Sequence, residues 1–442
     1  HPRCIGGFLW VLADEGVKRV DMDGFIDNQG NFGADGIVGP HHEKEGSFYT
    51  IKQLWSPVQI MNTSVDKQFD GKFSVENRYD YLNLNASNTT AQVLKQGEVQ
   101  GSDVAAHSAG VLDIKTTILP DADALFLTAI DRYGHELWRW TFPVNKLNQA
   151  NEVLSPLSNK VTSTETENEL TVKAKNHTFI FSKKDGQLKG VSVNNRKISF
   201  ANGPRFIGAR RADRSLDQFY NHDDEKAKEK DRTYSEFPDA AVFTKLDVKE
   251  DGGNLIVTAN YKLGNLDKAQ WTINPSGEAV LDYTYNFSGV VDLMGICFDY
   301  PEDQVISKRW LGAGPYRVWQ NRIHGTQYDV WENDYNDPIP GETFTYPEFK
   351  GYFGSVSWMN IRTKEGTISL TNETPDAYIG VYQPRDGRDR LLYTLPESGI
   401  SVLNVIPPVR NKVNSTDLCG PSSQPKWVNG PQSGRIIFRF ME

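Results

Sequence analysis

The sequence has 442 residues, more than one hydrophobic core usually covers, so two or three domains are expected. Its apolar content of 38% and charged content of 24% are ordinary for a globular protein. The formal charge of −9 argues against a nucleic acid or an anionic membrane as partner. No apolar run reaches the ~18 residues that a membrane-spanning helix needs.

The stretch from Gly6 to Trp55 predicts one unit of an α/β barrel. The apolar run Phe8–Leu12 follows two glycines and ends before acidic residues and a glycine, a pattern typical of a fully buried strand. A Gly- and Asn-rich loop comes next. Residues 43–55 carry apolar side chains at helical spacing and Pro57 follows them, which predicts a helix. One such unit cannot close a barrel.

Residues 58–143 show the pattern of a β-sandwich of about 100 residues, with short apolar runs between Asn, Gly and Asp clusters. The expected strands cover Val58–Met61, Phe73–Tyr79, Val111–Leu119, Ala124–Ile130 and Leu137–Phe142. The polar residues 144–168 are poor in aromatic side chains and predict an interdomain linker.

Residues 169–442 predict one large antiparallel β domain. Asp-Gly and Asn-Asn pairs lie between the expected strands, and they favour hairpin turns because such turns need positive φ. The strands cover Leu170–Ala174, Thr178–Ser182, Leu188–Val193, Lys197–Phe200, Leu255–Ala259, Ala269–Ile273 and Ala279–Phe287. The charged segment His222–Arg232 is interpreted as a loop in preference to a short helix. The predicted fold class is mainly β.

Two motifs near the start resemble glycoside hydrolase family 2, the β-galactosidase and β-glucuronidase family. Gly6–Trp10 followed by Asp14 is similar to the last strand of that family's catalytic barrel, although the second Trp of the family motif is absent here. Asn31–Val38 is similar to the family's Asn-Phe-x-x-[Asp/Asn]-Gly-[Leu/Ile]-Val stretch. Each match alone would be weak, and together they are a strong signal.

Further matches continue in family order to the end of the chain. They cover Ser74–Asp80, Trp310–Pro315, Trp319–Arg322, Tyr346–Glu348 and Cys419–Trp427. Arg210–Asp217 departs from the family's Arg-Ala-Pro-x-Asp-Asn-Asp segment. The resemblance implies four parts: the end of a (β/α)8 barrel at 1–57, an immunoglobulin-like β-sandwich at 58–143, a linker at 144–168, and a carbohydrate-binding β-supersandwich of the galactose-mutarotase kind at 169–442.

The resemblance implies a retaining exo-β-glycosidase that hydrolyses O-glycosidic bonds of oligo- or polysaccharides. Such enzymes use two carboxyl groups ~5–5.5 Å apart. Asp14 and Glu15 are poor candidates for this pair, since neighbouring side chains on a strand point to opposite faces. In the family both catalytic glutamates precede the Gly-Gly-Phe strand. We therefore expect no catalytic residue in this chain and no activity from the chain alone.

Four residues are candidates for binding the substrate. By resemblance Trp10 lines the subsite of the terminal sugar, where a Trp near the carboxyl end of a barrel strand could stack on a pyranose, and a barrel-core aromatic is the alternative. Phe32 and Asp35 match residues near the sugar's hydroxymethyl group, where some relatives bind a monovalent cation, so Na⁺ or Mg²⁺ stays open and no cofactor is required. Asp35 could equally be a turn residue. Trp427, expected in a loop from Pro421 to Gly434, is a candidate platform for the aglycone or a plain surface aromatic.

Other polar and aromatic groups are interpreted as structural. Cys4, Cys297 and Cys419 show no zinc-binding spacing, and one disulfide or free buried thiols both stay open. His41-His42 has no third ligand nearby and is interpreted as a polar patch at a helix start. Packing between sheets is favoured over a sugar groove for four aromatic residues: Trp319, Tyr328, Trp331 and Tyr335.

Two further functions stay open: a non-catalytic carbohydrate-binding or structural module, and the small subunit of a split glycosidase. Orphaned barrel strands expose apolar surface, so we expect the upstream part of the same enzyme or a large subunit as partner, besides a carbohydrate substrate. A homo-oligomer is a further option. The sequence starts at His1, without Met or signal peptide, which we interpret as a fragment of a longer protein. A periplasmic or secreted location is favoured over a cytoplasmic one.

Overall fold

The computed structural model describes the chain except for residues 1–5, 28–32, 34–35, 87, 93–96, 116, 119–121, 145–159, 212–233, 238, 335–350, 382–395, 397 and 409–419. The described residues form two compact units. The first unit takes those up to 144 and 323–329, and the second takes the rest. The fold is mainly β, as predicted, and α1 is the one α-helix in the part of the chain that the structure describes.

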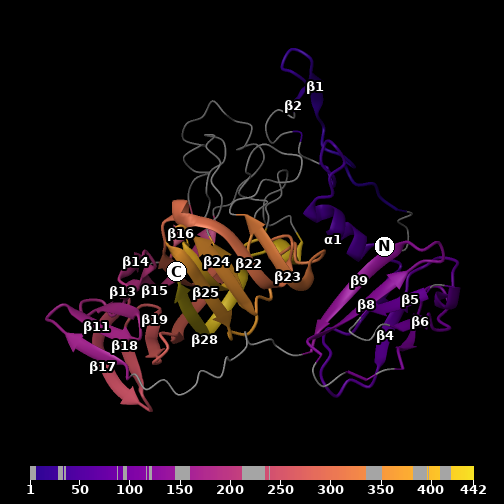
Figure 1. The fold of residues 1–442 in the computed structure, drawn as a ribbon. Coiled ribbons are helices and arrows are strands. Elements are labelled where there is room, and N and C mark those ends of the chain that lie inside the picture. The colour runs from indigo at the N-terminus through magenta and orange to yellow at the C-terminus, as the bar shows by residue number, and fades with distance from the viewer. Residues whose placement is uncertain are drawn as a thin grey trace. The chain divides into compact units, whose positions relative to one another are not determined.

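The first unit begins with an extended segment that carries a hairpin, drawn in indigo in Figure 1. Strands β1 (Val17–Arg19) and β2 (Phe25–Asp27) pair antiparallel. The guanidinium of Arg19 lies 2.7 Å from the Asp21 carboxylate and 2.8 Å from that of Asp27, so ion pairs close both the turn and the base of the hairpin.

Helix α1 (Gly46–Leu54) confirms the predicted helix, slightly shorter than expected. The Thr50 hydroxyl donates to the carbonyl of His324 at 2.9 Å, and the side-chain oxygen of Gln53 accepts from the peptide N–H of Gly325 at 2.6 Å. A Cβ at Gly325 would lie 2.5 Å from the backbone nitrogen of Thr50, so only glycine allows this close approach. The helix is therefore tied to residues 323–329 of the same unit.

The rest of the first unit is a sandwich of two antiparallel sheets, with strand orders β3-β4-β7 and β6-β5-β8-β9. The strands are β3 (Val58–Ile60), β4 (Lys72–Asn77), β5 (Asn88–Gln92), β6 (Gly97–Gln100), β7 (Ser108–Asp113), β8 (Ala124–Ile130) and β9 (Glu136–Pro143), with the 3-10 turn η1 (Leu84–Ala86) between β4 and β5. Buried and exposed positions alternate along β4 and β9, which places Phe73, Leu127 and Trp138 in one core. Four of the five strands predicted in this region are confirmed, whereas the strand predicted at Val111–Leu119 lies earlier, at Ser108–Asp113.

The second unit contains two large antiparallel sheets (Figure 1). The first has the order β10-β11-β12-β13-β15-β21-β27-β26, with β14 beside β13 and β16 beside β15. Its strands are β10 (Thr162–Glu165), β11 (Glu169–Ala174), β12 (His177–Ser182), β13 (Leu188–Val193), β14 (Arg196–Ile198), β15 (Ala201–Arg211), β16 (Tyr234–Glu236), β21 (Leu293–Asp299), β26 (Tyr378–Val381) and β27 (Ile400–Val405).

The second sheet has the order β17-β18-β19-β20-β28-β25-β24-β22-β23. Its strands are β17 (Val242–Asp251), β18 (Asn254–Lys262), β19 (Leu266–Ile273), β20 (Ala279–Val291), β22 (Val305–Gly314), β23 (Gln327–Asp334), β24 (Trp358–Thr363), β25 (Gly366–Asn372) and β28 (Lys426–Met441), and the 3-10 turns η2 (Glu302–Gln304) and η4 (Pro421–Ser423) precede β22 and β28. The long strands β20 and β28 pair over thirteen positions, from Ala279 with Phe438 to Val291 with Lys426.

Aromatic rings from both sheets meet in one core. Phe298 of β21 lies 4.6 Å from Phe200 and 5.5 Å from Phe438 of β28, ring centre to ring centre. Trp271 of β19 joins the same cluster and is 1% exposed. The two sheets therefore form a single sandwich with its hydrophobic residues between them.

The predicted hairpin turns are confirmed. Gly186 has φ +74°, and Asn194 and Asn195 have φ +48° and +65°. These turns join β12 to β13 and β13 to β14, and their residues tolerate positive φ better than most.

Two expectations at the domain edges are wrong. Phe8–Leu12 forms no strand, and Phe8, Leu9 and Leu12 are exposed by 104%, 51% and 63%. A buried strand needs neighbours on both sides, and among the described residues only Val11 and Leu12 of this segment are hydrogen-bonded, to Ile37 and Val38. The predicted linker is too long, because Thr162–Glu165 already pairs with β11 as an edge strand. Its side chains are all exposed, so no apolar alternation marks it in the sequence.

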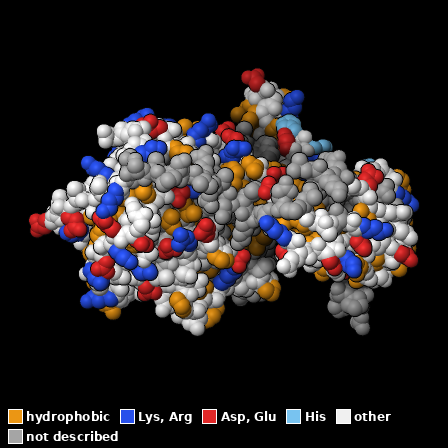
Figure 2. Space-filling model, turned by 60° about the horizontal axis from the view of Figure 1, so that its bottom comes forward, with side chains coloured by type: hydrophobic (Ala, Val, Ile, Leu, Met, Phe, Trp, Pro, Cys, Tyr) orange, Lys and Arg blue, Asp and Glu red, His pale blue; other side chains and the backbone are white. Residues whose placement is uncertain are grey.

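The surface carries charges of both signs. On the face drawn in Figure 2, Lys and Arg side chains are interspersed with Asp and Glu over the described residues. No helix among the described residues is long and apolar enough to cross a membrane.

Candidate functional site

Hydrogen bonds join the two motif segments at the start of the chain. The peptide N–H of Asp14 donates to the carbonyl of Val38 at 2.9 Å, and that of Val38 donates to Leu12 at 3.1 Å. The N–H of Glu15 donates to the carbonyl of Gly33 at 2.8 Å. The structure therefore brings residues 11–15 beside Gly33 and residues 36–38, as two halves of one site would require.

Asp14 fixes this junction from within. Its side chain is buried, with 6% exposed, and its Oδ1 accepts from the peptide N–H of Gly36 at 2.7 Å. A Cβ at Gly36 would lie 2.3 Å from the backbone nitrogen of Asp14 and 2.4 Å from the carbonyl oxygen of Val38. Only glycine allows this approach, so the Asp-Gly pair of the second motif has a structural reason for its glycine.

Trp10 lies at the end of this junction with its side chain 81% exposed. Within the described residues it is therefore not a core aromatic, and its ring faces are open to a ligand or a partner. Phe32 and Asp35 lie outside the described residues. Gly33 and Gly36, which follow them in the sequence, are hydrogen-bonded to the backbone of Glu15 and to the carboxylate of Asp14.

Trp427 lies on a strand, so the expectation of a loop from Pro421 to Gly434 is wrong. It is the second residue of β28 and faces Val290 of β20 across the ladder. The side chain is 70% exposed. Asn429 lies two residues further along β28, on the same side of the sheet as Trp427. Its Oδ1 accepts a hydrogen bond from the Ser288 hydroxyl at 2.7 Å, so Trp427 has polar neighbours on that side.

A pair of amide side chains holds the turn before Trp427. Nε2 of Gln320 donates to the carbonyl oxygens of Ser422 and Gln424 at 2.9 and 2.7 Å. Nδ2 of Asn321 donates to the Ser423 hydroxyl at 3.0 Å. Sequence reasoning missed this role, although the signal was present: these residues stand where the family has a Tyr-x-Asp-Arg stretch.

The motif Trp310–Pro315 has a structural role. Trp310 is fully buried and its indole N–H donates to the carbonyl of Ala313 at 3.0 Å. A Cβ at Gly314 would lie 2.3 Å from the indole of Trp331, so that ring packs directly on the glycine.

Trp319 packs in the same way. It is 2% exposed and its ring centre lies 5.6 Å from that of Tyr352. The prediction of packing is confirmed for Trp319 and Trp331, whereas Tyr335 lies outside the described residues.

Cys297 is a buried free thiol inside a hydrogen-bonded group. Burial raises the pKa of the thiol. Arg205 lies beside it, with Nη2 3.7 Å from the sulfur and 2.6 Å from Oδ1 of Asp299. Cys4 and Cys419 lie outside the described residues. The described residues contain no group of three or more His, Cys, Asp or Glu side chains that could hold a metal ion.

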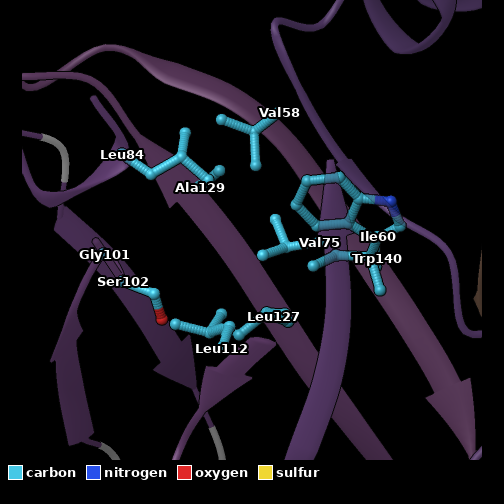
Figure 3. A pocket seen from close by; sticks show the side chains of 10 residues that line it. All are labelled: Val58, Ile60, Val75, Leu84, Gly101, Ser102, Leu112, Leu127, Ala129 and Trp140. Atoms are coloured by element: carbon cyan, nitrogen blue, oxygen red, sulfur yellow. The ribbon is translucent and has the colours of Figure 1, made fainter. Parts of the chain in front are cut away.

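A small cavity lies inside the first unit's sandwich (Figure 3). Its volume of about 20 Å³ is room for about one water molecule, far less than a sugar needs. The lining is almost wholly apolar: Val58, Ile60, Val75, Leu84, Gly101, Ser102, Leu112, Leu127, Ala129 and Trp140. It is a gap in the sandwich core and no substrate site.

Comparison with known proteins identifies the family. The family model described as "Beta galactosidase small chain" matches residues 173–405, more than half of the chain. The chain belongs to the β-galactosidase small chain family. A β-galactosidase of Priestia megaterium is 23% identical over 420 residues, which cover 85% of this chain and 38% of that protein. A β-galactosidase of Staphylococcus xylosus is 24% identical over 234 residues, 45% of this chain and 22% of that protein.

The chain thus spans less than two fifths of the length of the curated relatives that it matches. These matches agree with the resemblance to the C-terminal portion of a β-galactosidase. Among solved structures, galactose 1-epimerase from Lactobacillus acidophilus NCFM has 8% identity and a TM-score of 0.33 over 64% of this chain and 98% of its own. The protein HI1317 has 9% identity and a TM-score of 0.29 over 65% and 98%.

Proposed function

We propose that this chain forms the non-catalytic part of the sugar pocket of a retaining exo-β-glycosidase of the β-galactosidase kind. The family match supports the enzyme class, and the junction of residues 11–15 with Gly33 and residues 36–38 is the observation that carries the proposal. Both catalytic glutamates lie outside this chain. Its substrates are O-linked β-glycosides of oligo- or polysaccharides, cleaved through a covalent glycosyl-enzyme intermediate.

In this proposal Trp10 stacks on the apolar face of the terminal sugar, because its exposed ring lies at the end of the joined motif segments. By the resemblance Phe32 and Asp35 are candidates for binding the hydroxymethyl group, with a monovalent cation such as Na⁺ as an option at that position. Trp427 is the candidate platform for the aglycone.

A second candidate is the small subunit of a split glycosidase. The name of the matching family, which refers to a small chain, favours it. The first unit also exposes large apolar side chains that a partner polypeptide would cover, among them Phe8 at 104%, Leu12 at 63% and Trp55 at 66%. In both candidates the polypeptide that carries the glutamates covers this surface.

The test is hydrolysis of a panel of aryl glycosides by the chain alone and by the chain mixed with the upstream polypeptide. Activity only in the mixture supports the proposal. Turnover by the chain alone would overturn it, because it would require a carboxylate pair within these residues. No activity in either case would favour a carbohydrate-binding or structural module.

The role of Trp10 is tested in the active mixture. We expect Trp10→Ala to lower kcat/KM by about tenfold to a hundredfold, since burying an aromatic side chain against a ligand contributes about 1.5–3 kcal/mol. Tyr81→Ala is the matched control, because Tyr81 is an aromatic of the same unit that is 94% exposed. An equal loss in both variants would contradict a specific role for Trp10.

A further inference from the structure

The side chain of Gln320 binds the turn that leads into β28. Its amide group has two N–H bonds, and Nε2 donates to two carbonyl oxygens of the same turn, those of Ser422 and Gln424. The peptide N–H of Gln320 donates to the carbonyl of Pro407 at 3.0 Å. Gln320 is therefore hydrogen-bonded to the chain on both sides of residues 409–419: to Pro407 before them, and to Ser422 and Gln424 after them.

Gln320 is itself held by a rigid part of the second unit. Its neighbour Trp319 is 2% exposed and packs edge-on against Tyr352. A Cβ at Gly351 would lie 2.7 Å from the Trp319 indole nitrogen, so the backbone closes tightly over that ring. The core thus holds the backbone next to Gln320, from which the amide reaches the turn.

Trp427 lies near the end of a strand ladder, where support from the turn that Gln320 binds matters. Trp427 pairs with Val290 at the last position but one of the β20–β28 ladder, and ladder ends open at little cost in free energy. The exposed Trp427 side chain makes few contacts that would resist opening. The turn at Pro421–Ser423, two residues before the strand, is the nearest support on that side.

We infer that Gln320 is a positioning residue that fixes Trp427 for contact with the aglycone. The inference rests on the proposed role of Trp427 as aglycone platform. An amide is required at position 320 because both turn partners are acceptors: a carboxylate of the same size would face two carbonyl oxygens without a proton to donate. The sugars affected are those with an aromatic or extended aglycone, because the proposed function assigns Trp427 to that part of the ligand.

The experiment uses the chain labelled with 5-fluorotryptophan and followed by fluorine NMR. The sequence has ten tryptophans, and the Trp427 resonance is assigned by its absence in Trp427→Phe. Titration with p-nitrophenyl β-galactoside measures aryl binding, and methyl β-galactoside shows binding without an aromatic aglycone. We expect Gln320→Glu to broaden or shift the Trp427 resonance and to weaken aryl binding by about three- to tenfold, roughly the effect of one lost hydrogen bond.

Three variants make the result specific. Gln270→Glu adds the same charge on β19 of the same sheet and should change neither the Trp427 resonance nor the affinity. Gln320→Ala removes the amide without adding charge and should act like Gln320→Glu. In a Trp427→Ala background Gln320→Glu should have no further effect on aryl binding, because it acts through that ring.

The outcomes separate this inference from the function on which it rests. If Trp427→Ala weakens aryl binding and Gln320→Glu does not, the platform stands and the inference is wrong. If Gln320→Glu weakens both galactosides equally in the Trp427→Ala background, Gln320 acts by another route and the inference is also wrong. If Trp427→Ala binds p-nitrophenyl β-galactoside as tightly as the unaltered chain, the aglycone platform itself is refuted.

Discussion

Replacing Gly36 with alanine should separate the two N-terminal motif segments. The added Cβ would lie 2.3 Å from the nitrogen of Asp14, 2.4 Å from the oxygen of Val38 and 2.6 Å from the carbonyl carbon of Ala13. All three are backbone atoms, so no side-chain rotation relieves the overlap. Ordinary contact begins at 3.4 Å, and the segments must move apart by about 1 Å to reach it.

A shift of that size breaks the hydrogen bonds of the junction. The hydrogen bond from the Gly36 N–H to the buried Asp14 carboxylate contributes about 1.5–3 kcal/mol. Each of the two backbone hydrogen bonds, from Asp14 to Val38 and from Val38 to Leu12, contributes about 0.5–1.5 kcal/mol. The junction should therefore lose about 2.5–6 kcal/mol. Because about 1.4 kcal/mol is a factor of ten, protection of its amides from hydrogen exchange should fall at least about a hundredfold.

Hydrogen exchange resolved by residue is the assay, with the amides of Asp14 and Val38 as reporters. Gly97→Ala is the control, because a Cβ there meets nothing within 4 Å. The unfolding midpoint of the small sandwich should stay unchanged, since its core around Phe73 and Trp138 is separate from the junction. Unchanged exchange at both reporters in Gly36→Ala would refute the account of the junction.

Two predictions concern the second unit. Glu365→Ala should lower the free energy of unfolding by about 2–4 kcal/mol, because the carboxylate accepts hydrogen bonds from the Ser199 N–H, the Ser199 hydroxyl and the Tyr300 hydroxyl. Urea unfolding measures this loss, with Lys364→Ala as the control. An equal loss in both variants would contradict the prediction. Burial raises the pKa of Tyr283 to about 12, above the ordinary value of about 10, so the unfolded state loses the proton first. The free energy of unfolding should therefore fall as pH rises from about 10 to about 12, by up to about 1.4 kcal/mol per pH unit. In Tyr283→Phe this fall should be shallower, and an unchanged slope would contradict the prediction.

Strands with an apolar alternation could be predicted from the sequence. Ala124–Ile130 is observed with the predicted bounds, because its buried residues alternate with half-buried ones and turn residues flank it. The turn at Asn194-Asn195 could be predicted for a similar local reason, since both residues tolerate positive φ. Local patterns determine these elements, so a single sequence is enough to find them.

Elements that depend on distant partners could not be predicted. The edge strand Thr162–Glu165 has only exposed polar side chains, so its pairing with β11 leaves no period in the sequence. The run Phe8–Leu12 has the composition of a buried strand and stays exposed, because its composition does not determine whether neighbouring strands cover it. The contact of Gln320 with Ser422 spans 102 residues, and no local rule connects them.

The candidate site divides in the same way. Trp10, Asp14 and Gly36 could be found from motifs, and the structure explains why the last two are needed: one buried carboxylate binds the peptide of a glycine that no other residue could replace. Trp427 could be found as an aromatic near the end of the chain, but its place on a strand depends on thirteen pairs with β20.

The surroundings of the exposed tryptophans indicate different partners. Trp10 stands among exposed Phe8, Leu9 and Leu12, an apolar surface of the kind that the proposed polypeptide partner would cover. Trp427 stands beside the exposed Lys426 and on the same side of the sheet as Asn429, surroundings that suit a ligand with many hydroxyl groups. The proposal therefore predicts a polypeptide partner at Trp10 and a sugar at Trp427, and this difference is the reason to test Trp10 in the mixture and Trp427 in the chain alone.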